Sequence, residues 1–188
     1  MKDLINKFNN EYGENIDNWN WPNISYAPIL SEDFIREFKD KVDWYSISSC
    51  QKLSEGFIRE FQDKVNWFYV SYFQNLSEEF IREFQDKVDW EYISEKQNLS
   101  EDFIRKFENR VDWDYISLKQ KLSEDFIVEF KDKINFKKLL QNQYCPLNIK
   151  VEYIRKNVTK EDSSIHSIEE IEGKKDTSLE ELKKLIGV

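Results

Sequence analysis

Apolar and polar positions follow a helical spacing that returns many times along the chain. In the stretch "LSEEFIREFQDKVDWEYISEKQN" (76–98), the apolar residues of the first half fall within an arc of roughly 140° when they are placed at ~100° per residue. These residues are Leu76, Phe80, Ile81, Phe84 and Val88. The spacing differs from the strict alternation of a half-buried strand. It predicts an amphipathic helix with one buried face.

The same pattern recurs at a constant step of 23 residues. The leucines that open the repeats are Leu30, Leu53, Leu76, Leu99 and Leu122. The tryptophans with the same step are Trp21, Trp44, Trp67, Trp90 and Trp113, and Phe136 takes the next place. The pattern predicts five tandem repeats over residues 30–144, preceded by a degenerate capping repeat over residues 1–29.

Each repeat has the signals of two short helices. A serine at the first N-cap position precedes acidic residues, and an Asp or Asn precedes the tryptophan of the second helix. Ile93, Ser94 and Gln97 fall on the same side of the second helix as Trp90. Because such a helix pair cannot bury its apolar face alone, neighbouring repeats must stack. The predicted fold is all-α, an α-solenoid of 23-residue helix-turn-helix repeats.

Residues 145–188 depart from the pattern and are predicted to form a small C-terminal appendage. Ile149, Val151 and Tyr153 alternate as in a β-strand. The segment "IHSIEEIE" (165–172) would pair with this strand to form a β-hairpin. Ile149 and Tyr153 also match the two phenylalanine positions of a sixth repeat. Both alternatives stay open. "TSLEELKKLIGV" (177–188) predicts a final short helix.

Composition and charge exclude several classes of function. A net charge of −9 and a pI near 4.9 disfavour direct binding to nucleic acid or to an anionic membrane. No apolar run has the length of a membrane span, and "MKDLINKFNN" has no signal-peptide core, so an intracellular, cytoplasmic protein is expected. Cys50 and Cys145 are expected to be free buried thiols.

The sequence has none of the motifs that indicate catalysis. The only histidine, His166, stands in a polar connector, and there is neither a glycine-rich phosphate loop nor a nucleophile elbow. The carboxylates recur once per repeat, as on a solvated helix face. We therefore expect no enzyme, no metal and no cofactor.

Two further repeated sets have a structural interpretation. The arginines have acidic residues at i−4 and, except in the fourth repeat, at i+4, which predicts helix-surface ion pairs. They are Arg36, Arg59, Arg82 and Arg105. The tryptophans are predicted to lie in the core, because each stands beside a helix cap with an aliphatic residue three positions later.

The residues that differ between repeats lie on the outward face of the second helix. They occupy the first, second, fifth and sixth positions after each tryptophan: Tyr45, Ser46, Ser49, Cys50; Phe68, Tyr69, Tyr72, Phe73; Glu91, Tyr92, Glu95, Lys96; Asp114, Tyr115, Leu118, Lys119. Drift on a solvated face explains variation in general, but four outward aromatics in the second repeat suggest a protein-binding surface. The candidate partner-binding residues are Phe68, Tyr69, Tyr72, Phe73, Glu91, Tyr92, Glu95 and Tyr115.

The motif "LSEDFIREFxDKVDWxxIS", over about residues 20–144, resembles tandem-repeat proteins of large DNA viruses, with related sequences in some phages and bacteria. The resemblance implies a viral or mobile-element origin. If the protein is viral, its expected location is the host cytoplasm. Small acidic proteins of such origin often bind and block host factors, so the leading hypothesis is a protein-binding scaffold that inhibits a host defence protein.

Three alternatives to this hypothesis stay open. One is an acidic mimic of nucleic acid, which the net charge of −4 in residues 76–98 fits best. Another is a reader of one base per repeat, which the outward Glu91, Glu95 and Asp114 oppose. The third is a repeat with no task beyond structure.

Overall fold

The computed structural model describes residues 2–27 and 30–153, and within these ranges the regular structure is helical throughout, without a strand. The predicted hairpin strand at 165–172 and the final helix at 177–188 lie outside the described residues. The chain divides into two compact units, Met1–Asp112 and Trp113–Val188, which are described separately below. The division falls within the repeat that Leu99 opens, away from the predicted divisions at 29/30 and 144/145.

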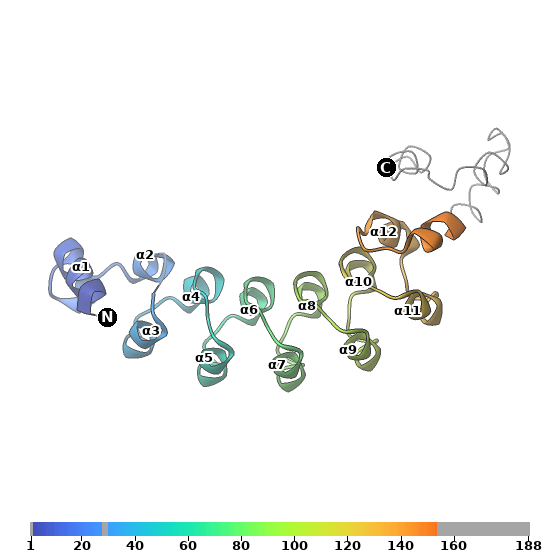
Figure 1. Cartoon of the computed structure of the whole chain (residues 1–188). Helices are drawn as coiled ribbons and strands as arrows, with labels where there is room; N and C mark the ends of the chain where they lie inside the picture. Colours follow the sequence, from blue (N-terminus) through green and yellow to red (C-terminus); the bar gives the residue numbers. More distant parts are fainter. Residues whose placement is uncertain (1, 28–29, 154–188) are drawn as a thin grey trace. The chain divides into compact units, whose positions relative to one another are not determined.

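The first unit consists of helix pairs in two layers. Its elements are α1 (Lys2–Tyr12), the 3-10 helix η1 (Ile16–Asn18), α2 (Trp21–Tyr26), α3 (Glu32–Glu37), α4 (Trp44–Cys50), α5 (Glu55–Glu60), α6 (Trp67–Phe73), α7 (Glu78–Glu83), α8 (Trp90–Lys96) and α9 (Glu101–Lys106). Figure 1 shows α2, α4, α6 and α8 side by side in one layer, and α3, α5, α7 and α9 in the other. This arrangement confirms the predicted α-solenoid of helical repeats.

Both predicted helix caps are confirmed. In the first helix of each repeat, the serine hydroxyl accepts a hydrogen bond from the backbone N–H three residues later, as Ser77 does from Phe80 at 3.2 Å. The second helix starts in the same way, because the Asp89 carboxylate accepts from the N–H groups of Glu91 and Tyr92. Since these bonds satisfy donors that a helix N-terminus leaves open, they fix where each short helix begins.

The first helix of each repeat is shorter than predicted. α7 ends at Glu83, and Phe84 and Val88, which were assigned to its apolar face, lie in the turn that follows. Both are nevertheless buried, at 7% exposure each. The turn keeps a helical hydrogen bond from Val88 N–H to Phe84 O at 3.1 Å. The turn after α7 therefore buries its apolar residues at the same four-residue spacing as a helix, although α7 itself ends at Glu83.

The repeated tryptophans differ in burial. Trp21 is buried at 8% exposure, which confirms the predicted core position, whereas Trp44, Trp67, Trp90 and Trp113 are half-buried at the edge of the core. Trp67 is half-buried, while Phe80 behind it is fully buried. Its ring lies 6.2 Å from the ring of Phe80 and 4.9 Å from that of Phe84. Its indole N–H donates to Gln62 O at 2.9 Å, so the polar edge of the ring stays near the surface while its apolar surface covers the phenylalanines.

Buried serines and glutamines join successive repeats. Ser71 donates to Trp67 O within its own helix at 2.8 Å and accepts from Asp89 N–H of the next repeat at 2.9 Å. Gln74 donates to Ser48 O at 3.1 Å and to Gln51 O at 2.8 Å, both in the preceding repeat. Equivalent glutamine bonds occur at Gln51. Gln97 makes the same bonds one repeat later, so three successive joints of the first unit are built alike.

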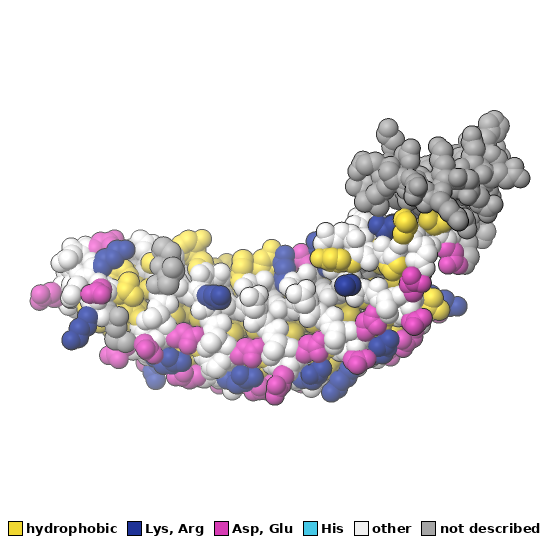
Figure 2. Space-filling model, in the orientation of Figure 1, with side chains coloured by type: hydrophobic (Ala, Val, Ile, Leu, Met, Phe, Trp, Pro, Cys, Tyr) yellow, Lys and Arg dark blue, Asp and Glu magenta, His cyan; other side chains and the backbone are white. Residues whose placement is uncertain are grey.

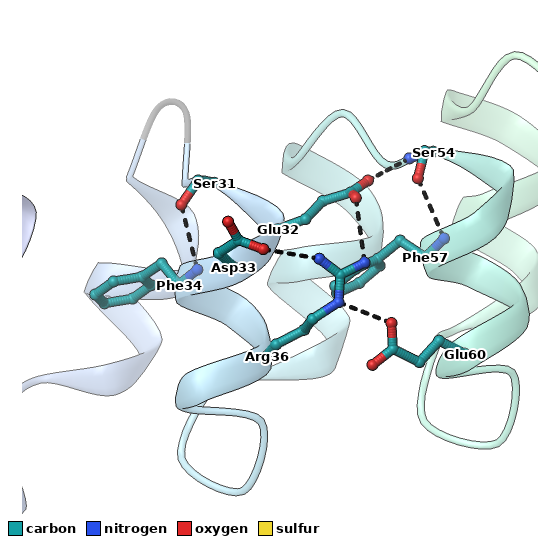
Figure 3. Close-up of polar contacts among 8 residues, drawn as sticks. All are labelled: Ser31, Glu32, Asp33, Phe34, Arg36, Ser54, Phe57 and Glu60. Atoms are coloured by element: carbon teal, nitrogen blue, oxygen red, sulfur yellow. Dashed lines mark hydrogen bonds and ion pairs between the residues drawn. The ribbon is translucent and has the colours of Figure 1, made fainter.

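The repeated arginine of the first helix also joins neighbouring repeats, as Arg36 shows (Figure 3). Arg36 donates to Glu60 of the next repeat at 2.7 Å, and its guanidinium lies 5.1 Å from the centre of the Phe57 ring. The i−4 pairing with Glu32 is present at 3.5 Å. The expected i+4 partner Asp40 instead pairs with Lys64 of the next repeat at 2.9 Å. It lies beyond the end of α3 at Glu37, and it is therefore no longer one helical turn from Arg36.

The amino-terminal end of the first unit is covered by α1. Phe8 is 3% exposed and packs against Trp19 and Phe34, at ring distances of 5.6 and 5.8 Å. α2 has the usual asparagine cap, at Asn20. The leading repeat thus keeps its second helix, while the longer α1 takes the place of the first.

The second unit contains α10 (Trp113–Lys119), α11 (Glu124–Glu129), α12 (Phe136–Gln141) and a further helix over 147–153. The strand alternative is wrong for 147–153, and the match of Ile149 and Tyr153 to a sixth repeat is confirmed. These two residues are four apart, one helical turn, and the Tyr153 ring stacks on Phe136 at 5.4 Å. Cys145 is buried at the leucine position, 23 residues after Leu122.

Candidate functional site

The candidate site is a cluster of aromatic side chains on the outer surface of α4, α6 and α8, which we call the aromatic face. Its members are Tyr45, Phe68, Tyr69, Tyr72, Phe73 and Tyr92. The cap determines where each of these helices begins. From that start, the isoleucine or valine and the serine of the helix point inward, and the first, fifth and sixth residues after the tryptophan point outward. Figure 2 shows hydrophobic side chains along this edge of the first unit and alternating charges over the other layer.

Three rings of the aromatic face are strongly exposed. Tyr45 is 56% exposed, Phe68 46% and Phe73 54%. Tyr69, Tyr72 and Tyr92 are half-buried among them. Large apolar side chains that are grouped in this way are characteristic of surfaces that bind another molecule.

The rings contact one another across all three helices. Tyr45 of α4 meets Tyr69 of α6 at a ring distance of 4.6 Å. Tyr92 of α8 lies 4.8 Å from Phe68 and 4.9 Å from Tyr72. These contacts are edge-to-face, the arrangement that aromatic quadrupoles favour. The mutual support holds the rings in place before any partner arrives, which lowers the entropy cost of binding.

Two tyrosines of the aromatic face, Tyr69 and Tyr92, have a raised pKa. Tyr69 donates its hydroxyl hydrogen to the Tyr45 hydroxyl, and this hydrogen bond is the main cause that raises the pKa of Tyr69. The pKa of Tyr92 is also raised, chiefly by the surrounding rings and then by the negative charge of Glu91. A neutral tyrosine hydroxyl can both donate and accept a hydrogen bond, and the raised pKa extends this neutral form to more alkaline pH.

The two predicted carboxylates differ in their surroundings. Glu91 is exposed, whereas Glu95 has a side-chain exposure of only 18% and pairs with Lys96 at 2.9 Å. The Lys96 ammonium lies 4.3 Å from the centre of the Tyr72 ring, and its hydrogen bond to Glu95 is the main cause that raises its pKa. Glu91 thus places an exposed carboxylate beside the rings.

The surroundings of one predicted site residue and of two other outward positions differ from what was expected. Tyr115 is half-buried on α10 in the second unit, so it is not placed with the rings of the first. Ser46 is buried at 7% exposure, because its hydroxyl donates to the cap Asp43. Cys50 is exposed, contrary to the expectation of a buried thiol, while Cys145 is buried as expected; both are free.

Two aromatic residues were missing from the predicted site. Tyr45 contacts Tyr69 directly, and Tyr26 on α2 is exposed at 68%. Tyr45 is the first residue after Trp44, and Tyr26 is the fifth after Trp21, so both stand at positions that the repeat comparison places outward. Counting aromatics at these positions in every repeat would have found them.

The described part of the chain has neither a candidate metal site nor a candidate membrane span. Residues 2–27 and 30–153 contain no group of three or more His, Cys, Asp or Glu side chains placed to hold a metal ion. None of the described helices has the length and apolar character that crossing a lipid bilayer demands. His166 lies outside the described residues.

No protein-family model, curated protein or solved structure matches the chain. The resemblance to viral tandem-repeat proteins therefore stays a prediction. The fold defines the class, an α-solenoid repeat protein, and the aromatic face is the feature from which a function can be argued.

Proposed function

We propose that the chain is a non-enzymatic scaffold that binds another protein through the aromatic face. The single observation that carries the proposal is the connected set of exposed rings that crosses α4, α6 and α8. Aromatic anchors supply most of the binding energy at protein interfaces. Burying such rings against a partner also removes apolar surface from water, at about 25 cal/mol per Å².

The charges of the first unit do not favour a mimic of nucleic acid. In the α3–α9 layer, acidic side chains alternate with cations that pair with them, as Glu83 does with Arg59 at 2.8 Å and Asp86 with Arg110 at 2.6 Å. A mimic needs rows of unpaired carboxylates to enter a basic channel. On the aromatic face itself, Glu95 is paired with Lys96.

The surface of the first unit also disfavours a reader of nucleic-acid bases. Single-strand binders offer ring faces to the bases, but here one face of each half-buried tryptophan covers buried phenylalanines. The resemblance to repeat proteins of viruses and phages further supports a host protein as the partner, with inhibition of a defence protein as the outcome of binding.

The repeats themselves supply a test variant that should fold. Phe68→Glu with Phe73→Lys gives the second repeat the residues that the third repeat already has at these positions, Glu91 and Lys96. The substitutions leave the net charge unchanged and touch only exposed side chains. A matched control, Glu79→Gln with Gln85→Glu, makes an equally neutral double change on the other layer.

Binding is measured by quantitative capture of proteins from a lysate of the cells that produce the chain, followed by titration with the isolated partner. We expect the Phe68/Phe73 variant to lose about 2 kcal/mol or more of binding energy, a factor of about 30 in Kd, and the control to bind normally. Raising the salt concentration should change the affinity little, because the anchors are apolar. Equal capture by wild type and variant, or a steep loss with salt, would contradict the proposal.

A further inference from the structure

The layer that contains α4, α6 and α8 presents its outward residues at a regular spacing. Serines and glutamines lock α4, α6 and α8 together with the same hydrogen bonds in each repeat. Packed helices lie ~8–10 Å apart, so equivalent surface positions recur at about this distance across the layer. A ligand that lies across the helices is recognised best when its own side chains return to one face at this distance.

Among regular peptide conformations, polyproline II fits this spacing. It has three residues per turn and a rise of ~3.1 Å per residue, so one face returns every ~9.3 Å. Side chains of a β-strand return to one face every ~6.6–6.8 Å, and those of an α-helix about every 5.4 Å. An extended strand would therefore fall out of step after one repeat, and a helix would match only with every second turn, at about 10.8 Å, slightly beyond this spacing.

The chemistry of the aromatic face suits the same ligand. A polyproline II segment has no internal hydrogen bonds, so its carbonyl groups need donors from outside. The exposed Tyr45 hydroxyl accepts from Tyr69, and its own hydrogen is available to donate to a partner carbonyl. Exposed aromatic rings such as Phe68 and Phe73 are the side chains on which proline rings pack in known modes of peptide recognition.

The charge at one end of the face gives the ligand a direction. Glu91 on α8 is exposed, and it occupies the position that Phe68 has one repeat earlier. Its charge contributes to the raised pKa of Tyr92, so the negative potential reaches the rings. Lys96 is already paired with Glu95. The α8 end of the face is therefore complementary to a basic side chain.

From this geometry we infer that the partner segment is a proline-rich peptide in the polyproline II conformation that crosses α4, α6 and α8, with a basic residue over Glu91. The inference rests on the proposed function and names its ligand class. The two steps from α4 to α8 span ~16–20 Å, which corresponds to about six residues of polyproline II. A second copy of the chain, a helix or a β-strand are the competing occupants.

The test uses the full chain and synthetic peptides in calorimetric titrations. Two ten-residue peptides carry eight prolines with two arginines at either the amino or the carboxyl end. Three controls replace alternate prolines by glycine, replace the arginines by glutamates, or use an amphipathic alanine-based helix of the same net charge. Sedimentation of the free chain at the same concentrations reports self-association.

We expect saturable binding of one arginine peptide below ~1 mM, at least tenfold weaker binding of its glycine control, and no preference for the helix. Phe68→Glu with Phe73→Lys should weaken binding at least tenfold. Glu91→Lys should remove the preference for arginine over glutamate peptides while the chain stays folded by circular dichroism. The control Glu79→Gln with Gln85→Glu should bind like the wild type.

Several outcomes would overturn the inference. They are no saturable binding of either arginine peptide, equal binding of the glycine control, tighter binding of the helix, or self-association that depends on Phe68 and Phe73. If a captured protein still needs these two residues, the proposed function holds and only the ligand class is wrong. If neither a captured protein nor any peptide depends on them, both proposals fail.

Discussion

Replacing Gln74 by methionine is the sharpest test of how the repeats are joined. The side chain is 3% exposed and makes three hydrogen bonds to backbone groups, two in the preceding repeat and one at Leu53, which opens its own repeat. Its amide donates to Ser48 O and Gln51 O, and its carbonyl accepts from Leu53 N–H at 2.9 Å. Methionine has a similar length, so it fills the same space but makes none of these bonds.

The expected cost follows from the groups that are left behind. Each buried backbone group that loses its partner costs about 1–3 kcal/mol, so three such groups should cost at least about 3 kcal/mol. That is a large fraction of the 5–15 kcal/mol that typically stabilises a folded domain. Gln74→Ala should cost somewhat more, because it also leaves a cavity.

Urea unfolding, followed by circular dichroism and by tryptophan fluorescence, measures the effect. With a slope of about 1–3 kcal/mol per M, the midpoint should fall by about 1 M or more. Gln85→Met is the matched control, because the bonds from Trp90 and Arg110 go to the Gln85 backbone carbonyl, which methionine retains. A loss for Gln74→Met below about 1 kcal/mol, or equal to that of the control, would refute the reasoning.

Three further outcomes are expected. Trp90→Ala should cost about 2 kcal/mol, less than the ~3–5 kcal/mol of a fully buried aromatic, because the indole is half-buried; urea unfolding checks this, and a cost above 4 kcal/mol would contradict the burial. Ser71→Ala should cost about 1–2 kcal/mol in the same assay, because it leaves the Asp89 N–H of the next repeat without its acceptor. An unchanged midpoint would show that this hydrogen bond does not help to hold the two repeats together. Tyr45→Phe should lower the pKa of Tyr69, measured by NMR titration of labelled tyrosine. Because the pKa of Tyr69 is raised in the folded chain, Tyr69 contributes stability below the usual tyrosine pKa and loses this contribution as the pH rises through the raised value. Tyr45→Phe should make this loss of stability smaller.

Much of the candidate site could be predicted by comparing the repeats with one another. The positions of Phe68 and Phe73 after Trp67 place both outward, and both are exposed. The half-burial of Tyr69 and Tyr92 could not be predicted in this way, because the rings that cover them come from neighbouring helices. The second position after the tryptophan lies at the border of the face, and the neighbour decides whether it is covered.

The sequence by itself determined the period of the repeat, the helical spacing and both caps. These features depend on residues within about four positions of one another, such as Ser77 and the N–H of Phe80, and a local pattern is enough to predict them. The match of Ile149 and Tyr153 to a sixth repeat is of the same kind, since the two are one helical turn apart.

Only the tertiary structure decided which groups meet across the repeats. Arg36 pairs with Glu60, and Gln74 binds the backbone of Ser48, although 24 and 26 residues separate these partners in the chain. Such contacts depend on how closely the helices stack and how they are rotated about their axes, and many side chains together set that geometry. The period places equivalent atoms in every repeat, but the packing determines which of them come within hydrogen-bonding distance.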